Sequence, residues 1–266
     1  MFTDIFGNNK PVIGMVHLPP LPLSPLWKGT AMDDIADFAL KDAAALASAG
    51  VDGLIIENQN DEPFLPGPVP VATVAFMAAL AYQVRQAVNI PIGVNVLFND
   101  WQAEIAIAEA VKASFIRVEV LVDTSWSDMG LLTACAPELL RLRSALHSHV
   151  NIFADVQGKY TSPCSPRPLV ESAKDAQARG LADAIIVTGS GTGHATPVES
   201  IKEVKQGVSI PVLAGSGTSP ENINDVFAVA DGAIIGSYFK MDGKLQNPVD
   251  INRVKTLMSK KNSGAK

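Results

Sequence analysis

The heptapeptide Asp52-Gly53-Leu54-Ile55-Ile56-Glu57-Asn58 is apolar on both faces of an extended chain and ends in polar side chains. The run Ala233-Ile234-Ile235, near the end of the chain, has the same character. Strands that are buried on both faces occur in parallel sheets covered by helices. Similar runs recur along the sequence and begin 22 to 41 residues apart. We therefore predict strands at Val12–Leu18, Gly53–Asn58, Ile90–Leu97, Phe115–Leu121, Asn151–Gln157, Ala184–Gly189, Ile210–Gly217 and Gly232–Phe239.

Ala-rich stretches separate these runs and carry apolar residues three and four positions apart, as in Asp33–Ser48 and Thr73–Val88. Eight such units predict an α/β fold, a closed (β/α)8 TIM barrel. An open doubly wound sheet is the alternative, but Pro19-Pro20-Leu21-Pro22 stands where that fold carries a glycine-rich fingerprint. Because no linker or composition shift divides the chain, we expect a single domain over residues 1–266, with a basic flexible tail from about 259 to 266.

Composition excludes several classes of protein. The net charge of −6 argues against a dedicated nucleic-acid-binding protein, because phosphate contacts need a basic face. The longest apolar stretch, Val69–Leu80, is too short to span a bilayer, and the first ten residues lack the pattern of a signal peptide. Cys135 and Cys164 have no CxxC spacing, so neither a disulfide framework nor a zinc ribbon is indicated. We therefore expect a cytoplasmic protein.

Glycine-rich ends follow the seventh and eighth predicted strands, at Gly215-Ser216-Gly217 and Gly236-Ser237. Their backbone N–H groups and a following helix N-terminus could bind an anion, and the two serines could donate hydroxyl groups. The alternative is that these glycines only form tight turns. Another glycine-rich segment, Gly189–His194, fits neither dinucleotide nor P-loop spacing and is either a loop that closes over a ligand or a passive loop. The positions of these ends, after two neighbouring strands late in the barrel, favour a phosphate site.

Polar side chains end the other strands. Glu57, Glu119, Asp155 and Lys159 are candidate catalytic residues, because neighbouring carboxylates can act as acid and base or bind one divalent ion such as Mg²⁺. The alternative is buried structural pairing with Arg117 or Lys159. His17 is either a ligand contact or a core histidine. The candidate ligand-binding residues are His17, Asn95, Thr188, Gly189, Gly215, Ser216, Gly217, Gly236 and Ser237.

The segment Pro63-Phe64-Leu65-Pro66-Gly67-Pro68-Val69-Pro70 is apolar and cannot pair as a central strand or form a helix. An exposed apolar segment of this kind is typical of an interface. We therefore expect a homo-oligomer. The alternative is a loop that covers the barrel.

The first predicted strand and its loop read Ile13-Gly14-Met15-Val16-His17-Leu18-Pro19-Pro20-Leu21-Pro22. With Asp52–Asn58, Phe115–Val118, Ala182–Gly189, Pro211–Gly217 and Pro248–Asp250, this run resembles the BtpA family, which includes the SgcQ-like proteins. The resemblance extends from about Ile13 to Val254 and implies a TIM barrel of the phosphate-binding type. This sequence departs from the family pattern at Phe98, where an Arg is usual, and around Gln157–Tyr160, where Val-Lys-His is usual.

The resemblance also implies two possible functions. The family's named member is linked to photosystem I biogenesis in cyanobacteria, at the periphery of the thylakoid, whereas other members occur in bacteria and archaea without photosynthesis. We expect an enzyme that binds or converts a small phosphorylated metabolite, either a sugar phosphate or a nucleotide-like molecule. The rival expectation is a non-catalytic peripheral factor for photosystem I biogenesis or stability.

Overall fold

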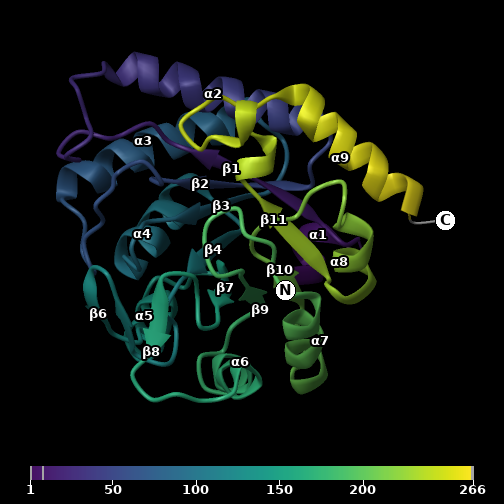
Figure 1. The fold of residues 1–266 in the computed structure, drawn as a ribbon. Helices are drawn as coiled ribbons and strands as arrows, with labels where there is room; N and C mark the ends of the chain where they lie inside the picture. The colour runs from purple at the N-terminus through teal and green to yellow at the C-terminus, as the bar shows by residue number, and fades with distance from the viewer. Residues whose placement is uncertain (1, 8, 265–266) are drawn as a thin grey trace.

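Eight parallel strands close into a barrel in the computed structural model, which describes residues 2–7 and 9–264 (Figure 1). Going around the barrel, β1 pairs with β2, then come β3, β4, β7, β9, β10 and β11, and β11 pairs with β1. The predicted (β/α)8 barrel is confirmed, and each strand lies inside its predicted run. The strands are β1 Val12–His17, β2 Gly53–Glu57, β3 Ile92–Asn95, β4 Phe115–Val118, β7 Asn151–Asp155, β9 Ala184–Val187, β10 Val212–Ala214 and β11 Gly232–Ile235.

Helices surround the barrel (Figure 1). None of the helices in the described residues is long and apolar enough to cross a membrane. Two short 3₁₀ helices, η1 Ser237–Phe239 and η2 Met241–Gly243, follow β11. The α-helices are α1 Phe2–Phe6, α2 Met32–Ser48, α3 Val71–Ala87, α4 Trp101–Val111, α5 Ala136–Ala145, α6 Leu169–Ala178, α7 Val198–Gly207, α8 Ile223–Val229 and α9 Ile251–Gly264.

The C-terminal tail differs from the sequence-based expectation. It was predicted to be flexible from Ser259 onward, but α9 continues to Gly264. Leu257 is fully buried, and the Lys261 ammonium lies 2.9 Å from an Asp52 carboxylate oxygen, so this end of the helix is held against the barrel. Residues 265 and 266 of the predicted tail lie outside the described residues.

A small antiparallel sheet sits on the loops that follow two barrel strands. It pairs β5 Ser125–Ser127 with both β6 Gly130–Leu132 and β8 Thr161–Pro163. Since β5 and β6 follow β4 and β8 follows β7, this sheet lies at the carboxyl end of the barrel.

Alternate side chains of each strand face the barrel interior. Near the amino ends of the strands these are apolar, and the rings of Phe115 and Phe153 stack with centroids 4.4 Å apart. Phe2 and Phe6 of α1 contact these two rings and close that end of the barrel. Gly93 is required beside them, because a Cβ atom there would lie 2.3 Å from the Phe115 ring. The same alternation brings the polar strand ends inward at the opposite, carboxyl end.

The Pro63–Pro70 segment forms neither helix nor strand, as predicted. The N–H of Gly67 donates to the Phe98 carbonyl at 3.3 Å, and the N–H of Val69 donates to Asp100 Oδ2 at 2.8 Å. Phe64 lines a pocket at the barrel mouth, whereas Leu65 is half exposed. The segment therefore covers part of the barrel mouth, which was the second of its two interpretations.

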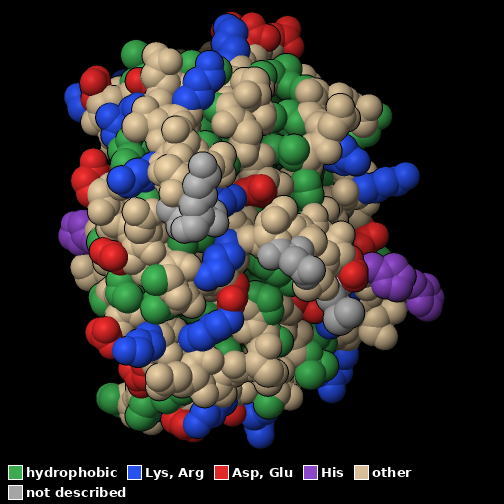
Figure 2. Space-filling model, turned by 90° about the vertical axis from the view of Figure 1, so that its right-hand side faces the viewer, with side chains coloured by type: hydrophobic (Ala, Val, Ile, Leu, Met, Phe, Trp, Pro, Cys, Tyr) green, Lys and Arg blue, Asp and Glu red, His purple; other side chains and the backbone are tan. Residues whose placement is uncertain are grey.

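The face shown in Figure 2 carries basic and acidic side chains intermixed. Among its described residues, Figure 2 shows no extended basic area of the kind that nucleic-acid binding requires.

Candidate functional site

Two adjoining pockets open at the carboxyl ends of the strands. In each pocket, the space that the centre of a water-sized sphere can reach is about 30 Å³. Both pockets are lined by Glu57, Gln59, Arg117 and Lys159, so they form two halves of one cavity. Phe64, Leu97, Phe98 and Tyr160 also line the first half, which we call the aromatic half. His17, Gly193, Gly215, Ser216, Gly217, Gly236 and Ser237 also line the second half, which we call the glycine half.

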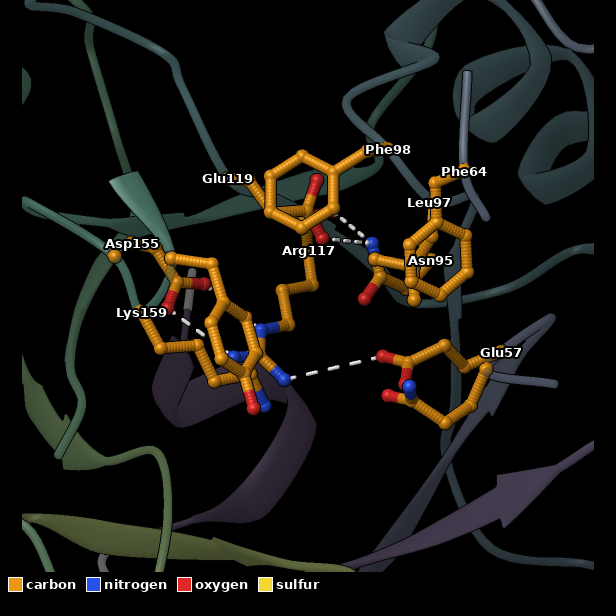
Figure 3. Close-up of a pocket in the computed structure, with 12 residues that line it drawn as sticks. Glu57, Phe64, Asn95, Leu97, Phe98, Arg117, Glu119, Asp155 and Lys159 are labelled. Atoms are coloured by element: carbon orange, nitrogen blue, oxygen red, sulfur yellow. Dashed lines mark hydrogen bonds and ion pairs between the residues drawn. The ribbon is translucent and has the colours of Figure 1, made fainter. Parts of the chain in front are cut away.

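Arg117 lies at the centre of the cavity, between two carboxylates (Figure 3). Its Nε and Nη2 donate to Asp155 at 2.8 and 3.1 Å, which is a bidentate pair, and its Nη1 lies 3.9 Å from Glu57 Oε2. Burial by itself would lower the pKa of Arg117, but Asp155 and Glu57 raise it, so the guanidinium stays charged. Because Nη1 has no close hydrogen bond, it can still donate to a ligand.

Glu57 is less firmly held than Asp155. Besides the long contact to Arg117, its Oε1 lies 3.6 Å from His17 Nε2. Burial raises the pKa of Glu57, although Arg117 and Lys159 act to lower it. Burial and then the charges of Lys240, Lys159 and Arg117 lower the pKa of His17 well below its ordinary value, so the imidazole is neutral at pH 7. The Glu57 carboxyl group is thus free to accept or donate a proton.

Lys159 carries an unpaired charge. Its backbone N–H donates to Thr188 Oγ1 at 3.2 Å, but its ammonium has no hydrogen bond or ion pair within residues 2–7 and 9–264. Burial, followed by the charge of Arg117, lowers the pKa of this group. Lys159 lines both halves of the cavity, so a half-buried cation faces the space where a ligand would lie.

Glu119 belongs to a hydrogen-bond network behind Arg117. The Asn95 amide Nδ2 donates to Glu119 Oε1 at 2.6 Å and to Glu104 Oε1 at 3.1 Å. Burial raises the pKa of Glu119 to about 8, although Arg117 acts against this shift. Burial and the nearby Glu119 raise the pKa of Glu104 well above its ordinary value. At neutral pH this buried carboxyl pair therefore holds at least one proton.

The glycine half presents free backbone donors. The N–H groups of Gly217, Gly236 and Ser237 have no acceptor in the described part of the chain, and neither has the Ser237 hydroxyl. A Cβ atom at Gly236 would lie 2.8 Å from His17 Cε1, so the backbone approaches the cavity closely there. These are features of an anion site.

Two expectations for the glycine half need correction. The Ser216 hydroxyl accepts from the Gly189 N–H and donates to the His194 carbonyl at 2.9 Å, so its proton is not available to a ligand. The helix expected directly after Gly217 begins only at Ile223 and has seven residues. Any anion binding here therefore depends on the loop N–H of Gly217 and on the first N–H groups of the short 3₁₀ helix η1, rather than on the N-terminus of an α-helix.

The structure thus gathers most of the predicted site residues in one cavity. Thr188 and Gly189 are exceptions, because neither lines either half of the cavity. The Thr188 hydroxyl accepts a hydrogen bond from the backbone N–H of Lys159, and the Gly189 N–H donates to the Ser216 hydroxyl. The described residues contain no group of three or more His, Cys, Asp or Glu side chains that could hold a metal ion, and Arg117 lies between the carboxylates of Glu57 and Asp155.

Sequence reasoning missed Arg117 as a central residue and considered it only as a pairing partner. The signal was its position: Arg117 stands two residues before Glu119, and side chains two residues apart in an extended chain point to the same side. Gln59 and Phe64 were also missed as lining residues. No local pattern marks them, because each reaches the cavity through the path of the long loop after β2.

Comparison with known proteins connects this chain to one family. The sequence profile of the BtpA family matches residues 8–263. An uncharacterized protein of Methanocaldococcus jannaschii is 42% identical over 252 residues, which cover 95% of each chain. Photosystem I biogenesis protein BtpA of Synechocystis is 38% identical over 98% of this chain and 91% of its own length.

Solved structures share the fold at low sequence identity. Thiamine phosphate pyrophosphorylase from Pyrococcus furiosus superposes with a TM-score of 0.59 at 13% identity, covering 97% of this chain and 98% of its own. GGGPS from Thermoplasma volcanium gives a TM-score of 0.60 at 16% identity, covering 96% and 94%. These structures support the barrel, and the sequence matches over nearly the whole length go further: the chain is a member of the BtpA family.

Proposed function

We propose that this protein is an enzyme that binds and converts a small phosphorylated compound, a sugar phosphate or a nucleotide-like molecule, at the carboxyl end of its barrel. One observation carries the proposal. The unpaired Lys159 ammonium faces the same pocket as the free N–H groups of Gly217, Gly236 and Ser237. Backbone donors that converge beside a cation suit a phosphate group.

The residues around the phosphate would divide the chemistry. Glu57 would act as acid or base, because its pKa is raised by burial and its carboxyl group makes no short hydrogen bond. Lys159 would contact the phosphate or the reacting carbon. Asp155 would position Arg117, whose Nη1 points toward the ligand space near Glu57. Glu119 would act from behind Asn95 as a buried proton store. A divalent cation such as Mg²⁺ would need the ligand phosphate to complete its coordination.

The name of the Synechocystis relative favours a second candidate, a non-catalytic factor for photosystem I biogenesis that is peripheral to a membrane. The names of archaeal relatives at 41–42% identity, such as those of Methanocaldococcus and Archaeoglobus, make no mention of photosystem I. We therefore place the enzyme first. A cytoplasmic location and a homo-oligomeric state, with Leu65 of the Pro63–Pro70 segment at an interface, complete the proposal.

Calorimetric titration with ribose 5-phosphate, and with ribose as the phosphate-free control, tests phosphate binding. We expect the wild-type protein to bind only the phosphorylated sugar. Lys159→Met should weaken binding by roughly 10- to 100-fold, the size of a charge-assisted hydrogen bond. The matched control Lys174→Met removes an exposed lysine that pairs with Glu171 on α6, and it should leave the affinity unchanged.

Equal binding of ribose and ribose 5-phosphate, or an equal effect of the two lysine variants, would contradict the proposed phosphate site. Turnover separates the two candidate functions. Binding of a phosphorylated compound without conversion of any member of a sugar phosphate and nucleotide panel would favour the non-catalytic factor.

A further inference from the structure

We infer that the ligand of this cavity carries a planar ring at the end opposite its phosphate, as a nucleoside monophosphate does. The inference rests on the proposed function and narrows the class of compound. Its basis is the contrast between the two halves of the cavity, which share one set of polar residues and otherwise differ in chemistry.

The aromatic half is built for an apolar group. Phe64, Leu97 and Phe98 line it on the side opposite Lys159 and Asp155 (Figure 3). The centroids of the Phe64 and Phe98 rings lie 6.2 Å apart, and the angle between the ring planes is 50°. The two rings are therefore not stacked face to face on one another. A sugar phosphate alone would leave water against these rings, which is unfavourable for apolar surface. A flat ring would replace that water and stack on Phe64, which is only partly buried.

The middle of the cavity is built for hydroxyl or N–H groups. Asn95 is fully buried, and its Oδ1 has no hydrogen-bond partner among the described residues. Figure 3 shows this amide between the aromatic side chains and Arg117. Gln59, a residue 7% exposed that lines both halves, has no side-chain hydrogen bond in the described part of the chain, so its amide is also available to a ligand. Unsatisfied buried polar groups call for a partner, and a ribose supplies hydroxyl groups at this position.

The three zones therefore follow one another in the order of a nucleotide: phosphate in the glycine half, sugar beside Asn95, Gln59 and Lys159, and ring in the aromatic half. Aromatic side chains contribute roughly 5- to 150-fold to the affinity for a stacked base. This size makes the inference measurable.

The experiment compares ribose 5-phosphate with the 5′-monophosphates of adenosine, guanosine, cytidine and uridine by calorimetry. We expect at least one nucleotide to bind tenfold or more tightly than ribose 5-phosphate. Phe64→Ala should abolish this gain and leave the affinity for ribose 5-phosphate unchanged. The matched variant Phe64→Leu keeps an apolar side chain without a ring face, so it should also lose most of the gain. A thermal melt of each variant checks that it is folded.

Two results would overturn the inference. In the first, ribose 5-phosphate binds as tightly as every nucleotide. The phosphate site would then stand, but the ring of a nucleotide would contribute nothing to the affinity. In the second, the nucleotide gain survives in Phe64→Ala, which places the ring elsewhere. If neither ribose 5-phosphate nor any nucleotide binds, the proposed function itself fails, and this outcome is distinct from the other two.

Discussion

The two ends of the barrel interior are made by the same strands but have opposite chemistry. At the amino end, Phe115 and Phe153 stack and α1 closes the barrel over them. At the carboxyl end, two residues further along the same strands, Arg117 and Asp155 form a buried ion pair beside an open cavity. A shift of two residues keeps the side chain on the same face and moves it one layer along the barrel.

This difference indicates that the two ends of the barrel have different roles. Stacked, buried rings stabilise a fold because they remove apolar surface from water. Unpaired or protonated polar groups in a cavity lower stability and are typical of functional sites. We therefore expect substitutions at the amino end to change stability alone, and substitutions at the carboxyl end to change ligand binding, with a smaller loss of stability where a buried ion pair is broken. The following predictions test this contrast, beginning with the largest expected effect.

Phe153→Ala should lower the free energy of unfolding by about 3–5 kcal/mol, because it leaves a cavity beside Phe115 and Phe2. Urea denaturation measures the change. Tyr82→Ala, which removes a half-exposed ring on α3, is the control and should change stability by less than about 1 kcal/mol. A loss of stability in Phe153→Ala as small as that in Tyr82→Ala would contradict the proposal that the amino end of the barrel stabilises the fold.

Asp155→Asn should lower the free energy of unfolding by about 1–3 kcal/mol, because the Arg117 guanidinium loses a bidentate partner in a buried site. It should also weaken ligand binding by tenfold or more, since Arg117 is no longer held in place. A thermal melt and a titration with ribose 5-phosphate measure both effects on one preparation. Lower stability with unchanged affinity would mean that Asp155 is a structural residue only.

The contribution of Glu119 to the free energy of unfolding should fall as the pH rises from about 4.5 to about 8. These are the pKa values of Glu119 in the unfolded and the folded chain. The pKa of Glu119 is raised from 4.5 to about 8 on folding, so within this range the folded state holds a proton that the unfolded chain releases. Glu119→Gln should reduce this pH dependence, whereas the exposed Glu203→Gln should preserve it. Urea denaturation at pH 5 and pH 8 gives the slope, and an unchanged slope in Glu119→Gln would show that Glu119 is ionised at pH 5.

Lys159→Met should have the smallest effect on stability, between no change and a gain of about 1 kcal/mol. The ammonium is half-buried without a partner among the described residues, so its removal leaves no opposite charge stranded. Urea denaturation of this variant beside Lys174→Met measures the difference. A loss of more than 1 kcal/mol would show that Lys159 stabilises the fold.

The barrel could be predicted because runs such as Leu54-Ile55-Ile56 are buried on both faces, a property that sequence shows directly. The strand-end positions of Glu57, Glu119 and Asp155 followed from the same pattern. Their partners did not, because which carboxylate meets Arg117 depends on the pairing of β4 with β7 and on strand alternation. The hydrogen bonds of the Ser216 hydroxyl could not be predicted, because they join residues that are 22 and 27 positions apart in the sequence. The ordered end of α9 could not be predicted either, because Lys261 pairs with Asp52, which is far away in the sequence.

A crystal structure with bound ribose 5-phosphate tests the central claim most directly. We predict phosphate density in the glycine half, with its oxygens at hydrogen-bond distance from the N–H groups of Gly217 and Gly236 or Ser237 and from the Lys159 ammonium. Phosphate bound at the amino end of the barrel, or a ligand with its phosphate against Phe64 and its sugar in the glycine half, would contradict the account.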